Sequence, residues 1–182
     1  MSSTSNPDGS ISETQLRQTI RDILVGLDEV HSQDIVHLDI KPENILLGKS
    51  GKYKLADLGM ARLLTKITEA HTIPEGDCRY LARELLSREV LQNLPDLKKS
   101  DIFSLGITAY ELIALVNLEK NGKEWQALRQ GTFEYPAHVL KLYSAELLGT
   151  VRRMLSPNTD DRPRARDLLQ TVFISSEQRI IS

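Results

Sequence analysis

The spacing of apolar positions from residue 12 to residue 30 predicts an amphipathic helix. Ser12, followed three residues later by Gln15, matches a capping box and places the start of a helix there. Apolar side chains then recur every three or four residues, as on the buried face of a helix. This face consists of Leu16, Ile20, Ile23, Leu24, Leu27 and Val30. We expect it to pack against the core of the domain.

Short extended segments follow this helix. Ile35–Val36 is β-branched and predicts a short strand leading into a polar loop. The apolar runs at 45–47 and 53–55 enclose a Gly-Lys-Ser-Gly turn at 48–51, which is typical of a β-hairpin. Residues 60–79 show no clear period. We expect a long functional loop there, because such loops are uncommon inside compact domains.

The pattern from residue 81 onward is helical. The most apolar stretch, at 100–115, predicts a buried helix. Gly131 is expected to end the helix at 124–130, and Pro163 suits the first turn of the last helix. The expected helices cover 81–87, 100–115 (the buried one), 124–130, 145–155 and about 163–172. We therefore predict a mainly α fold with one or two small β-hairpins beside a site carried by loops.

Composition narrows the class of protein. A chain of 182 residues with 40% apolar content suits one domain with a real core. The net charge of −2 and the scattered basic residues predict no binding to nucleic acid. Cys78 is the single cysteine, which excludes an internal disulfide and is typical of a reducing compartment. No apolar run approaches the roughly 20 residues of a membrane span, so we expect a soluble, intracellular protein.

Candidate chemistry is concentrated between residues 37 and 59. Phosphoryl transfer needs a carboxylate that orients the attacking hydroxyl and takes its proton, and Asp39 is the candidate. Lys41 can neutralise the transferring phosphate, and both Asn44 and Asp57 offer the hard oxygen ligands that Mg²⁺ prefers. Gly59 is expected to let the backbone turn after Asp57. These assignments follow the arrangement known for phosphoryl-transfer enzymes.

The chain resembles the C-terminal lobe of eukaryotic protein kinases. Five motifs carry the resemblance in the expected order. They are the catalytic loop His37–Asn44, the metal-binding triplet Asp57-Leu58-Gly59, Ala82-Arg83-Glu84 in place of Ala-Pro-Glu, the start of the central helix at Asp101–Gly106, and Arg162. The resemblance implies ATP and Mg²⁺ as cofactors. It implies catalytic roles for Asp39 and Lys41, nucleotide contacts from Lys41, Asn44, Leu46 and Asp57, and metal binding by Asn44 and Asp57.

A closer resemblance is to the Wee family of cell-cycle kinases. It rests on Glu75-Gly76-Asp77-Cys78-Arg79-Tyr80-Leu81, on Leu58, and on residues 121–131. It implies that Glu75, Gly76 and Asp77 form a substrate and activation segment. It also implies that the protein partner is a cyclin-dependent kinase, and that phosphorylation of a tyrosine on this partner inhibits entry into mitosis. The location that it implies is the nucleus, or otherwise the cytoplasm. The membrane-associated Myt kinases share the Glu-Gly-Asp motif, but the expected absence of a membrane segment favours the Wee branch.

Two departures from the kinase pattern change the expected behaviour. Leu38 replaces the arginine that often anchors a phosphorylated activation loop, so phosphorylation at Thr65, Thr68, Thr72 or Tyr80 is not expected to be required. No glycine-rich loop precedes Asp39, and Lys41 is the first lysine of the chain. The N-terminal β lobe is therefore missing, which should cost about 4 kcal/mol or more in transition-state stabilisation. We expect weak or no activity from this chain alone.

Plainer roles are expected for several prominent residues. His37 is expected to be a structural core histidine, Glu84 and Arg162 a buried ion pair, and Asp101 an acceptor for buried amides. Trp125 should pack against the lobe, while Glu75 and Asp77 could be only a solvated acidic turn. The expected organisation is a flexible segment at 1–11, a kinase C-lobe at 12–173 and a tail at 174–182. The alternative function is a non-catalytic module that docks cell-cycle kinase partners.

Overall fold

A computed structural model describes residues 10–67, 76–86 and 96–170. Its helices are α1 Glu13–Ser32, α2 Arg83–Leu86, α3 Lys98–Ala114, α4 Lys123–Gln130, α5 Val139–Leu142, α6 Ala145–Met154 and α7 Ala165–Leu168, with 3-10 turns η1 Pro42–Asn44 and η2 Leu64–Lys66. Its strands are β1 Ile35–Val36, β2 Ile45–Leu47, β3 Tyr53–Leu55 and β4 Arg62–Leu63. The predicted mainly α fold is confirmed.

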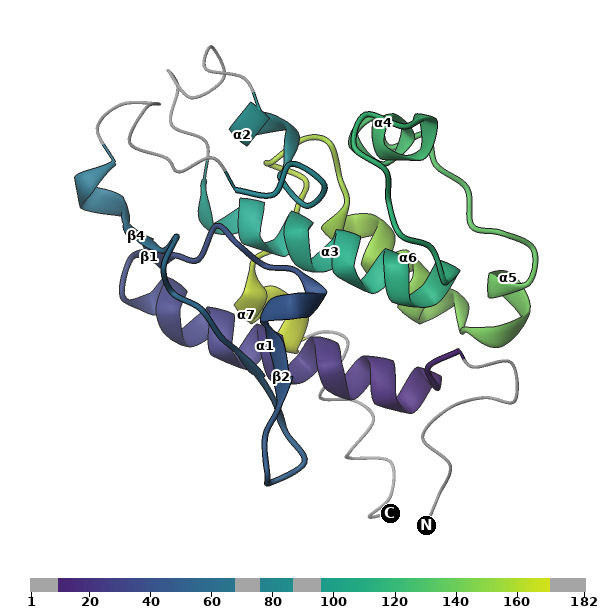
Figure 1. The fold of residues 1–182 in the computed structure, drawn as a ribbon, viewed down its shortest axis with the longest axis horizontal. Helices are drawn as coiled ribbons and strands as arrows, with labels where there is room; N and C mark the ends of the chain where they lie inside the picture. Colours follow the sequence, from purple (N-terminus) through teal and green to yellow (C-terminus); the bar gives the residue numbers. More distant parts are fainter. Residues whose placement is uncertain (1–9, 68–75, 87–95, 171–182) are drawn as a thin grey trace.

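α1 forms the base of the domain, and its sequence determines both its start and its buried face. The Ser12 side chain accepts a hydrogen bond from the amide of Gln15, as a capping box requires. No hydrogen bond returns from the Ser12 amide to the Gln15 side chain, whose nitrogen donates to the Tyr53 hydroxyl at 2.9 Å. The predicted face is buried except at Val30, which is partly exposed. In Figure 1, α1 runs beneath α3, and the β2–β3 hairpin lies against it.

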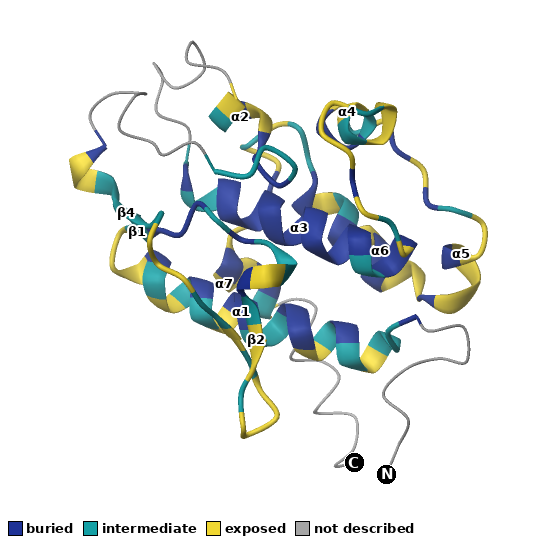
Figure 2. Ribbon diagram, viewed as in Figure 1, coloured by how far each residue is buried: buried dark blue, intermediate teal, exposed yellow. Residues whose placement is uncertain are grey.

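α3 is the centre of the hydrophobic core. Fourteen of its 17 residues are buried, which is typical of a helix surrounded by other elements. Figure 2 shows this helix almost entirely in the colour of buried residues. Gly106 makes close contact with α6 possible, because a Cβ there would lie 3.1 Å from side-chain atoms of Met154 and Leu155. The core therefore depends on a small residue at this crossing.

The strands form two separate antiparallel pairs. β2 pairs with β3, with Ile45 opposite Leu55, which confirms the predicted hairpin. β1 pairs with β4, with Ile35 opposite Leu63. β4 and η2 lie within the stretch at 60–79 that the sequence predicted to be a loop, so that prediction was wrong for these two elements. The pairing joins residues 26 and 28 positions apart in chain order, and each strand has only two residues, too few for a periodic signal.

Two further differences concern the helical half. α7 begins at Ala165, two residues after the predicted start, with Arg164 as its N-cap residue, whose backbone amide donates to Oδ2 of Asp167 at 3.0 Å. The four-residue helix α5 was not predicted. α4 ends as expected at Gly131, whose φ of 71° is a left-handed conformation that glycine adopts readily. The predicted segments at 1–11 and 174–182 lie largely or wholly outside the described residues.

Candidate active site

The catalytic loop between β1 and η1 is anchored by a buried carboxylate. Asp101, at the start of α3, accepts hydrogen bonds from the backbone amides of His37 and Leu38, both at 2.8 Å. Its second contact through Oδ2 is to Nε2 of the buried His31, also at 2.8 Å. The predicted role of Asp101 is therefore confirmed. Leu38 has a φ of 66°, a conformation that costs energy in leucine, and the two hydrogen bonds to Asp101 help to maintain it.

His37 has the structural role that the sequence predicted. Its side chain is fully buried, and Nδ1 lies 3.3 Å from the backbone amide of Asp39. Nε2 of the same ring is buried with no hydrogen-bond partner in the described part of the chain. The ring thus supports the backbone of the loop from inside the domain.

The Asp39 carboxylate is the meeting point of the loop's polar side chains. Nζ of Lys41 lies 2.9 Å from both of its oxygens. The side-chain nitrogen of Asn44 donates at 2.8 Å to Oδ2 and at 2.8 Å to the backbone oxygen of Asp39. The structure therefore brings together Asp39, Lys41 and Asn44, as the sequence predicted. Their catalytic and nucleotide-binding roles remain predictions.

Asp57 is placed beside Asn44 by the pairing of the hairpin. Beyond the last paired residues, the Ala56 amide donates to the Asn44 carbonyl at 2.8 Å, so the next residue, Asp57, follows directly. Asp57 is exposed and has a φ of 63°. The backbone turns at Gly59, as predicted, and the Ala61 amide donates to the Leu58 carbonyl at 3.0 Å across this turn. The left-handed residue beside it is Asp57 and not the glycine. Gly59 also donates its amide to Oδ1 of Asp57 at 3.0 Å, and a Cβ on Gly59 would lie 3.0 Å from that oxygen.

The donor set near Asn44 fits a magnesium ion that takes few ligands from the protein. The described residues contain no group of three or more histidine, cysteine or acidic side chains arranged to hold a metal. Mg²⁺ usually takes one or two protein oxygens and completes its shell with water and phosphate oxygens. Because the side-chain nitrogen of Asn44 faces Asp39, its Oδ1 is left to act as the acceptor. Oδ1 of Asn44 and the exposed carboxylate of Asp57 match this requirement.

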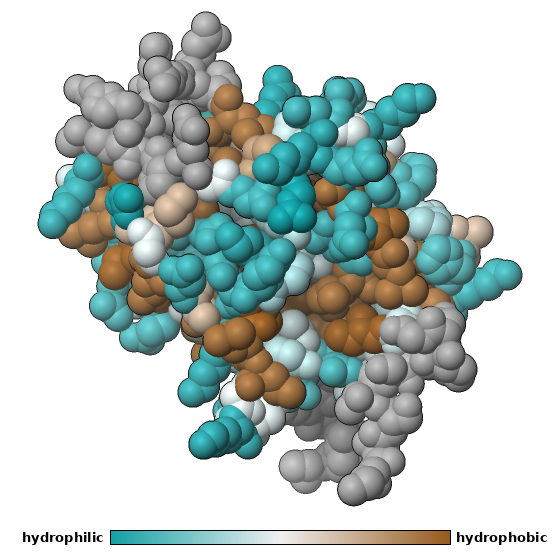
Figure 3. All heavy atoms as spheres, viewed as in Figure 1, coloured by the Kyte–Doolittle hydropathy of each residue, from teal (hydrophilic) through white to brown (hydrophobic). Residues whose placement is uncertain are grey.

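Apolar side chains stand exposed on the hairpin next to this donor set. Leu46 is 54% exposed, Leu47 63% and Leu58 61%. Figure 3 shows hydrophobic atoms gathered over β2 on the face in view. Leu46, the predicted nucleotide contact, is therefore accessible to a ligand or to another protein segment.

The predicted substrate segment contacts the catalytic loop. Of its members, Glu75 lies outside the described residues. A Cβ on Gly76 would lie 3.1 Å from the carbonyl oxygen of Leu38, so the two backbones approach closely. Asp77 is paired with Arg79 at 2.6 Å, and hydrogen bonds from Arg79 hold the pKa of the Asp77 carboxyl below its usual range. Arg79 also lies 3.8 Å from Glu43 on the catalytic loop. Asp77 is thus part of a paired structure and not a freely solvated turn.

Leu38 has an apolar environment in place of a phosphate anchor. It is 4% exposed and packs in a small cluster with Val36, Ile67 and Leu97. Ile67 directly follows η2, the 3-10 turn after β4, so its packing against Leu38 joins this part of the chain to the catalytic loop. Tyr80 is also buried, and its hydroxyl donates to Glu111 at 2.8 Å. Thr65 is exposed, whereas Thr68 and Thr72 lie outside the described residues.

The ion pair between Glu84 and Arg162 is confirmed as buried. Nη1 of Arg162 lies 2.6 Å from Oε1 of Glu84, and both residues are at most 3% exposed. Arg162 also donates to the carbonyls of Lys99 and Ser156. The pair links α2, α3 and the segment before α7, which fits the structural role predicted for it.

Sequence reasoning missed Arg129 on α4. This side chain is 4% exposed, and burial lowers its pKa to about 10. It stacks on Trp125, with 3.9 Å between its guanidinium carbon and the ring centroid. Trp125 packs against the lobe, as predicted. An arginine on a short helix gives no sequence signal of burial, because its acceptors are backbone carbonyls, which every residue carries.

Comparison with known proteins identifies the family. Residues 2–174 match the family described as the protein kinase domain. The match extends over most of the sequence, so the chain belongs to the protein kinase domain family.

Similar curated proteins are kinases of the Wee group. The membrane-associated tyrosine- and threonine-specific cdc2-inhibitory kinase of Drosophila melanogaster is 36% identical over 87% of this chain. The Wee1-like protein kinase of Arabidopsis thaliana is 36% identical over 87%, and the mitosis inhibitor protein kinase wee1 of Schizosaccharomyces pombe is 32% identical over 88%. The chain spans 28%, 29% and 20% of the lengths of these three relatives, respectively.

The predicted resemblance to Wee kinases is confirmed by these matches. The choice of the Wee branch over the membrane-associated branch remains a prediction, because both groups match at similar identity. Within the described part of the chain, no helix has the length and apolar character that crossing a membrane requires.

Proposed function

We propose that this chain forms the catalytic C-lobe part of a Wee-type protein kinase whose protein substrate is a cyclin-dependent kinase. The observation that carries the proposal is the convergence of Lys41 and Asn44 on the Asp39 carboxylate, with Asp57 following directly beside Asn44. The similarity to proteins named as cdc2-inhibitory kinases supports the choice of substrate. A nuclear location is part of the same proposal.

Each residue of the convergence has a definite task in this proposal. Asp39 orients the substrate hydroxyl and accepts its proton, because its carboxylate is fixed by two side-chain donors. Lys41, partly exposed beside it, offers a positive charge to the phosphate. Asn44 and Asp57 would hold Mg²⁺. ATP, when bound, supplies the phosphoryl group that is transferred.

The same proposal predicts that the isolated chain transfers phosphate slowly. Its sequence before Asp39 contains no glycine-rich loop and no lysine to clamp the phosphates from above. Loss of such positioning and charge stabilisation should reduce the rate by about three powers of ten or more. Measurable transfer should nevertheless depend on Asp39.

A phosphotransfer assay on the purified chain tests this function. The chain is incubated with MgATP and a cdc2-type cyclin-dependent kinase, and incorporated phosphate is measured for the natural sequence, Asp39→Asn and the control Asp160→Asn. Asp160 is an exposed surface residue of the loop before α7. We expect slow transfer that Asp39→Asn removes and Asp160→Asn leaves unchanged. Equal transfer by natural chain and Asp39→Asn would contradict the assigned base.

A binding module is the second candidate function. The observation that favours it is the exposure of Leu46, Leu47 and Leu58 beside the site, which offers an apolar contact surface. Affinity for a cyclin-dependent kinase without detectable nucleotide binding would select this function over catalysis. Calorimetric titration with MgATP and with the cyclin-dependent kinase separates the two.

A further inference from the structure

The backbone at Cys78–Leu81 is held by side chains of two helices. The four consecutive backbone carbonyls of residues 78–81 all accept hydrogen bonds from side chains. Arg129 of α4 donates to the carbonyls of Cys78, Arg79 and Leu81, at 3.0, 2.9 and 2.6 Å. The carbonyl of Tyr80 accepts from Ser104 of α3 at 2.9 Å. The conformation of this segment is thus specified by α3 and α4, since it lies in neither a helix nor a strand.

Arg129 is an unusual residue for this task. It is 4% exposed, and no ion pair to a carboxylate accompanies it among the described residues. A buried cation is costly without partners, and the three segment carbonyls, together with the Trp125 carbonyl at 3.2 Å, are the acceptors that compensate for its lost hydration. Nε of Arg129 is buried and has no hydrogen-bond partner in the described part of the chain. The guanidinium therefore depends on the segment as much as the segment depends on it.

Trp125 completes the arrangement on α4. Its Nε1 donates to the Cys78 carbonyl at 2.9 Å, which also accepts from Arg129. The guanidinium of Arg129 stacks on the Trp125 ring at 3.9 Å and lies 5.6 Å from the centroid of Phe103 in the core. We name Trp125 and Arg129, with the carbonyls that they bind, the α4 clamp.

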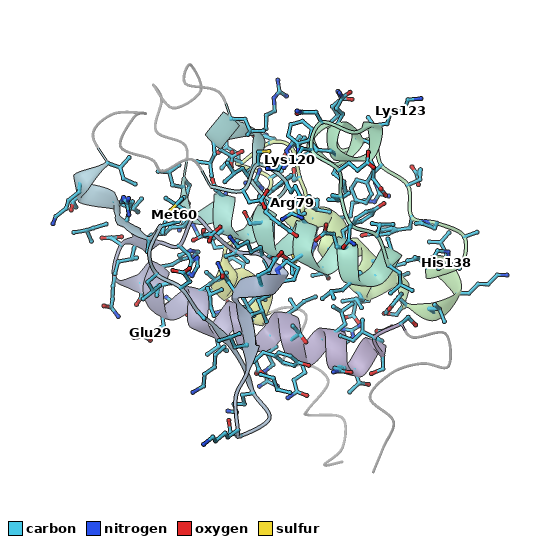
Figure 4. The ribbon with its side chains drawn as sticks, in the orientation of Figure 1. Glu29, Met60, Arg79, Lys120, Lys123 and His138 are labelled. Carbon is cyan, nitrogen blue, oxygen red and sulfur yellow. The ribbon has the colours of Figure 1, made fainter. Side chains whose placement is uncertain are left out.

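The clamped segment faces the catalytic loop. Arg79, labelled in Figure 4, projects over α3 in that view, between α2 and α4. It binds Asp77 and lies 3.8 Å from Glu43, which is four residues from Asp39 in the sequence. Gly76 approaches the Leu38 carbonyl on the same loop. A shift of the clamp would therefore move Asp77 and Arg79 relative to Asp39.

We propose that Arg129 is a positioning residue for the protein substrate, because the α4 clamp fixes residues 76–81 at the place where that substrate approaches Asp39. This inference rests on the proposed function, which supplies the cyclin-dependent kinase as substrate. It adds a determinant on α4, a helix that holds none of the predicted catalytic residues.

The chain contains its own reporter for the clamp. Cys78 is the single cysteine of the sequence and is partly exposed. Since the clamp holds the carbonyl of Cys78, the rate at which its thiol reacts with a chromogenic aromatic disulfide should rise when the clamp no longer fixes this backbone. Arg129→Met removes every donor, whereas Arg129→Lys keeps the positive charge and loses the planar fork. Arg152→Met is the matched control, since Arg152 also stacks on a ring, Phe133 at 4.4 Å, and donates to a carbonyl.

Two measurements on the full chain decide the inference. Cys78 should react about tenfold faster in Arg129→Met, by a smaller factor in Arg129→Lys, and at the natural rate in Arg152→Met. Affinity for a cdc2-type cyclin-dependent kinase should fall about tenfold in Arg129→Met, by a smaller factor in Arg129→Lys, and stay unchanged in Arg152→Met. Circular dichroism checks that each variant retains the natural helix content.

Each outcome has a distinct meaning. Unchanged Cys78 reactivity in both Arg129 variants would show that no clamp operates. Faster Cys78 reaction with unchanged affinity would reduce the clamp to a structural role and overturn the inference. Failure of the natural chain to bind the cyclin-dependent kinase would overturn the proposed function, and with it the substrate role, while the Cys78 rates would still decide whether the clamp exists.

Discussion

The catalytic loop and the β2–β3 hairpin are neighbours in the fold but are supported in different ways. The loop is tied to the core by Asp101, which is 1% exposed and accepts two of its amides. The hairpin ends in exposed residues, and β2 presents Leu46 and Leu47 at the surface. Figure 2 shows the same contrast between the buried α3 and the exposed end of the hairpin. Changes beneath the loop should therefore affect folding, whereas changes on the hairpin should affect mainly ligand contacts.

The largest effect on the free energy of unfolding is expected from Arg162→Met, which breaks the buried ion pair between Arg162 and Glu84. Removal of one partner leaves Glu84 charged and buried, and it should lower the free energy of unfolding by about 3–5 kcal/mol. Arg164→Met is the matched control, because the Arg164 side chain is 66% exposed and its pair with Asp96 should contribute less than about 1 kcal/mol. Urea unfolding measures both. Similar losses in the two variants would contradict the assigned difference in burial.

Asp101→Asn tests the support of the catalytic loop directly. The amide keeps the shape of the side chain but replaces one acceptor oxygen with a donor, so one buried amide of His37 or Leu38 loses its partner. The free energy of unfolding should fall by about 1–3 kcal/mol, and Asp160→Asn should have no measurable effect. A stable Asp101→Asn variant with unchanged amide exchange at Leu38 would contradict the claim that the catalytic loop, unlike the hairpin, depends on a buried anchor.

Alkaline pH should weaken the core through its tyrosines. Burial raises the pKa of Tyr80, Tyr110 and Tyr135, and hydrogen bonds to Glu111 and Glu124 add to the shift for the first two. A raised folded-state pKa gives stability that is complete below the ordinary tyrosine value of about 10 and is lost as pH rises above it. Urea unfolding should thus show a constant free energy up to about pH 9 and a decline above about pH 10, less steep in Tyr80→Phe.

The smallest effect on folding is expected from Leu46→Gln. The side chain is 54% exposed, so the free energy of unfolding should change by less than about 0.5 kcal/mol. The same variant should lower affinity for nucleotide if Leu46 contacts it, as predicted. A loss of stability as large as that of Asp101→Asn would show that the hairpin belongs to the core after all.

Much of the fold could be predicted because periodic burial leaves a pattern in the sequence. The buried face of α1, the hairpin and the central helix α3 follow from apolar spacing and turn residues. β4 and α5 could not be found in this way, because each is too short to show a period. The start of α7 was displaced because the cap is formed by Arg164 and Asp167, a pair outside the usual preference for a cap.

The candidate site likewise contains residues that the sequence could predict and residues that it could not. Asp39, Lys41, Asn44 and Asp101 could be predicted since their side chains carry distinctive chemistry in one short motif or one known position. Arg129 could not, because its partners are the carbonyls of a segment about 50 residues away. The left-handed conformation of Asp57 was also missed, since glycine two residues later was the more obvious candidate for a turn.

The most direct test of the central claim is to locate a divalent cation by NMR. Mn²⁺, which accepts the same oxygen ligands as Mg²⁺, is titrated into the chain with ATP, and line broadening is recorded for side-chain and backbone amides. We predict selective broadening at the Asn44 side chain and the Gly59 amide, lost in Asp57→Asn, with the Gln18 side chain unaffected. Equal broadening in the natural chain and Asp57→Asn, or broadening centred elsewhere, would contradict the account.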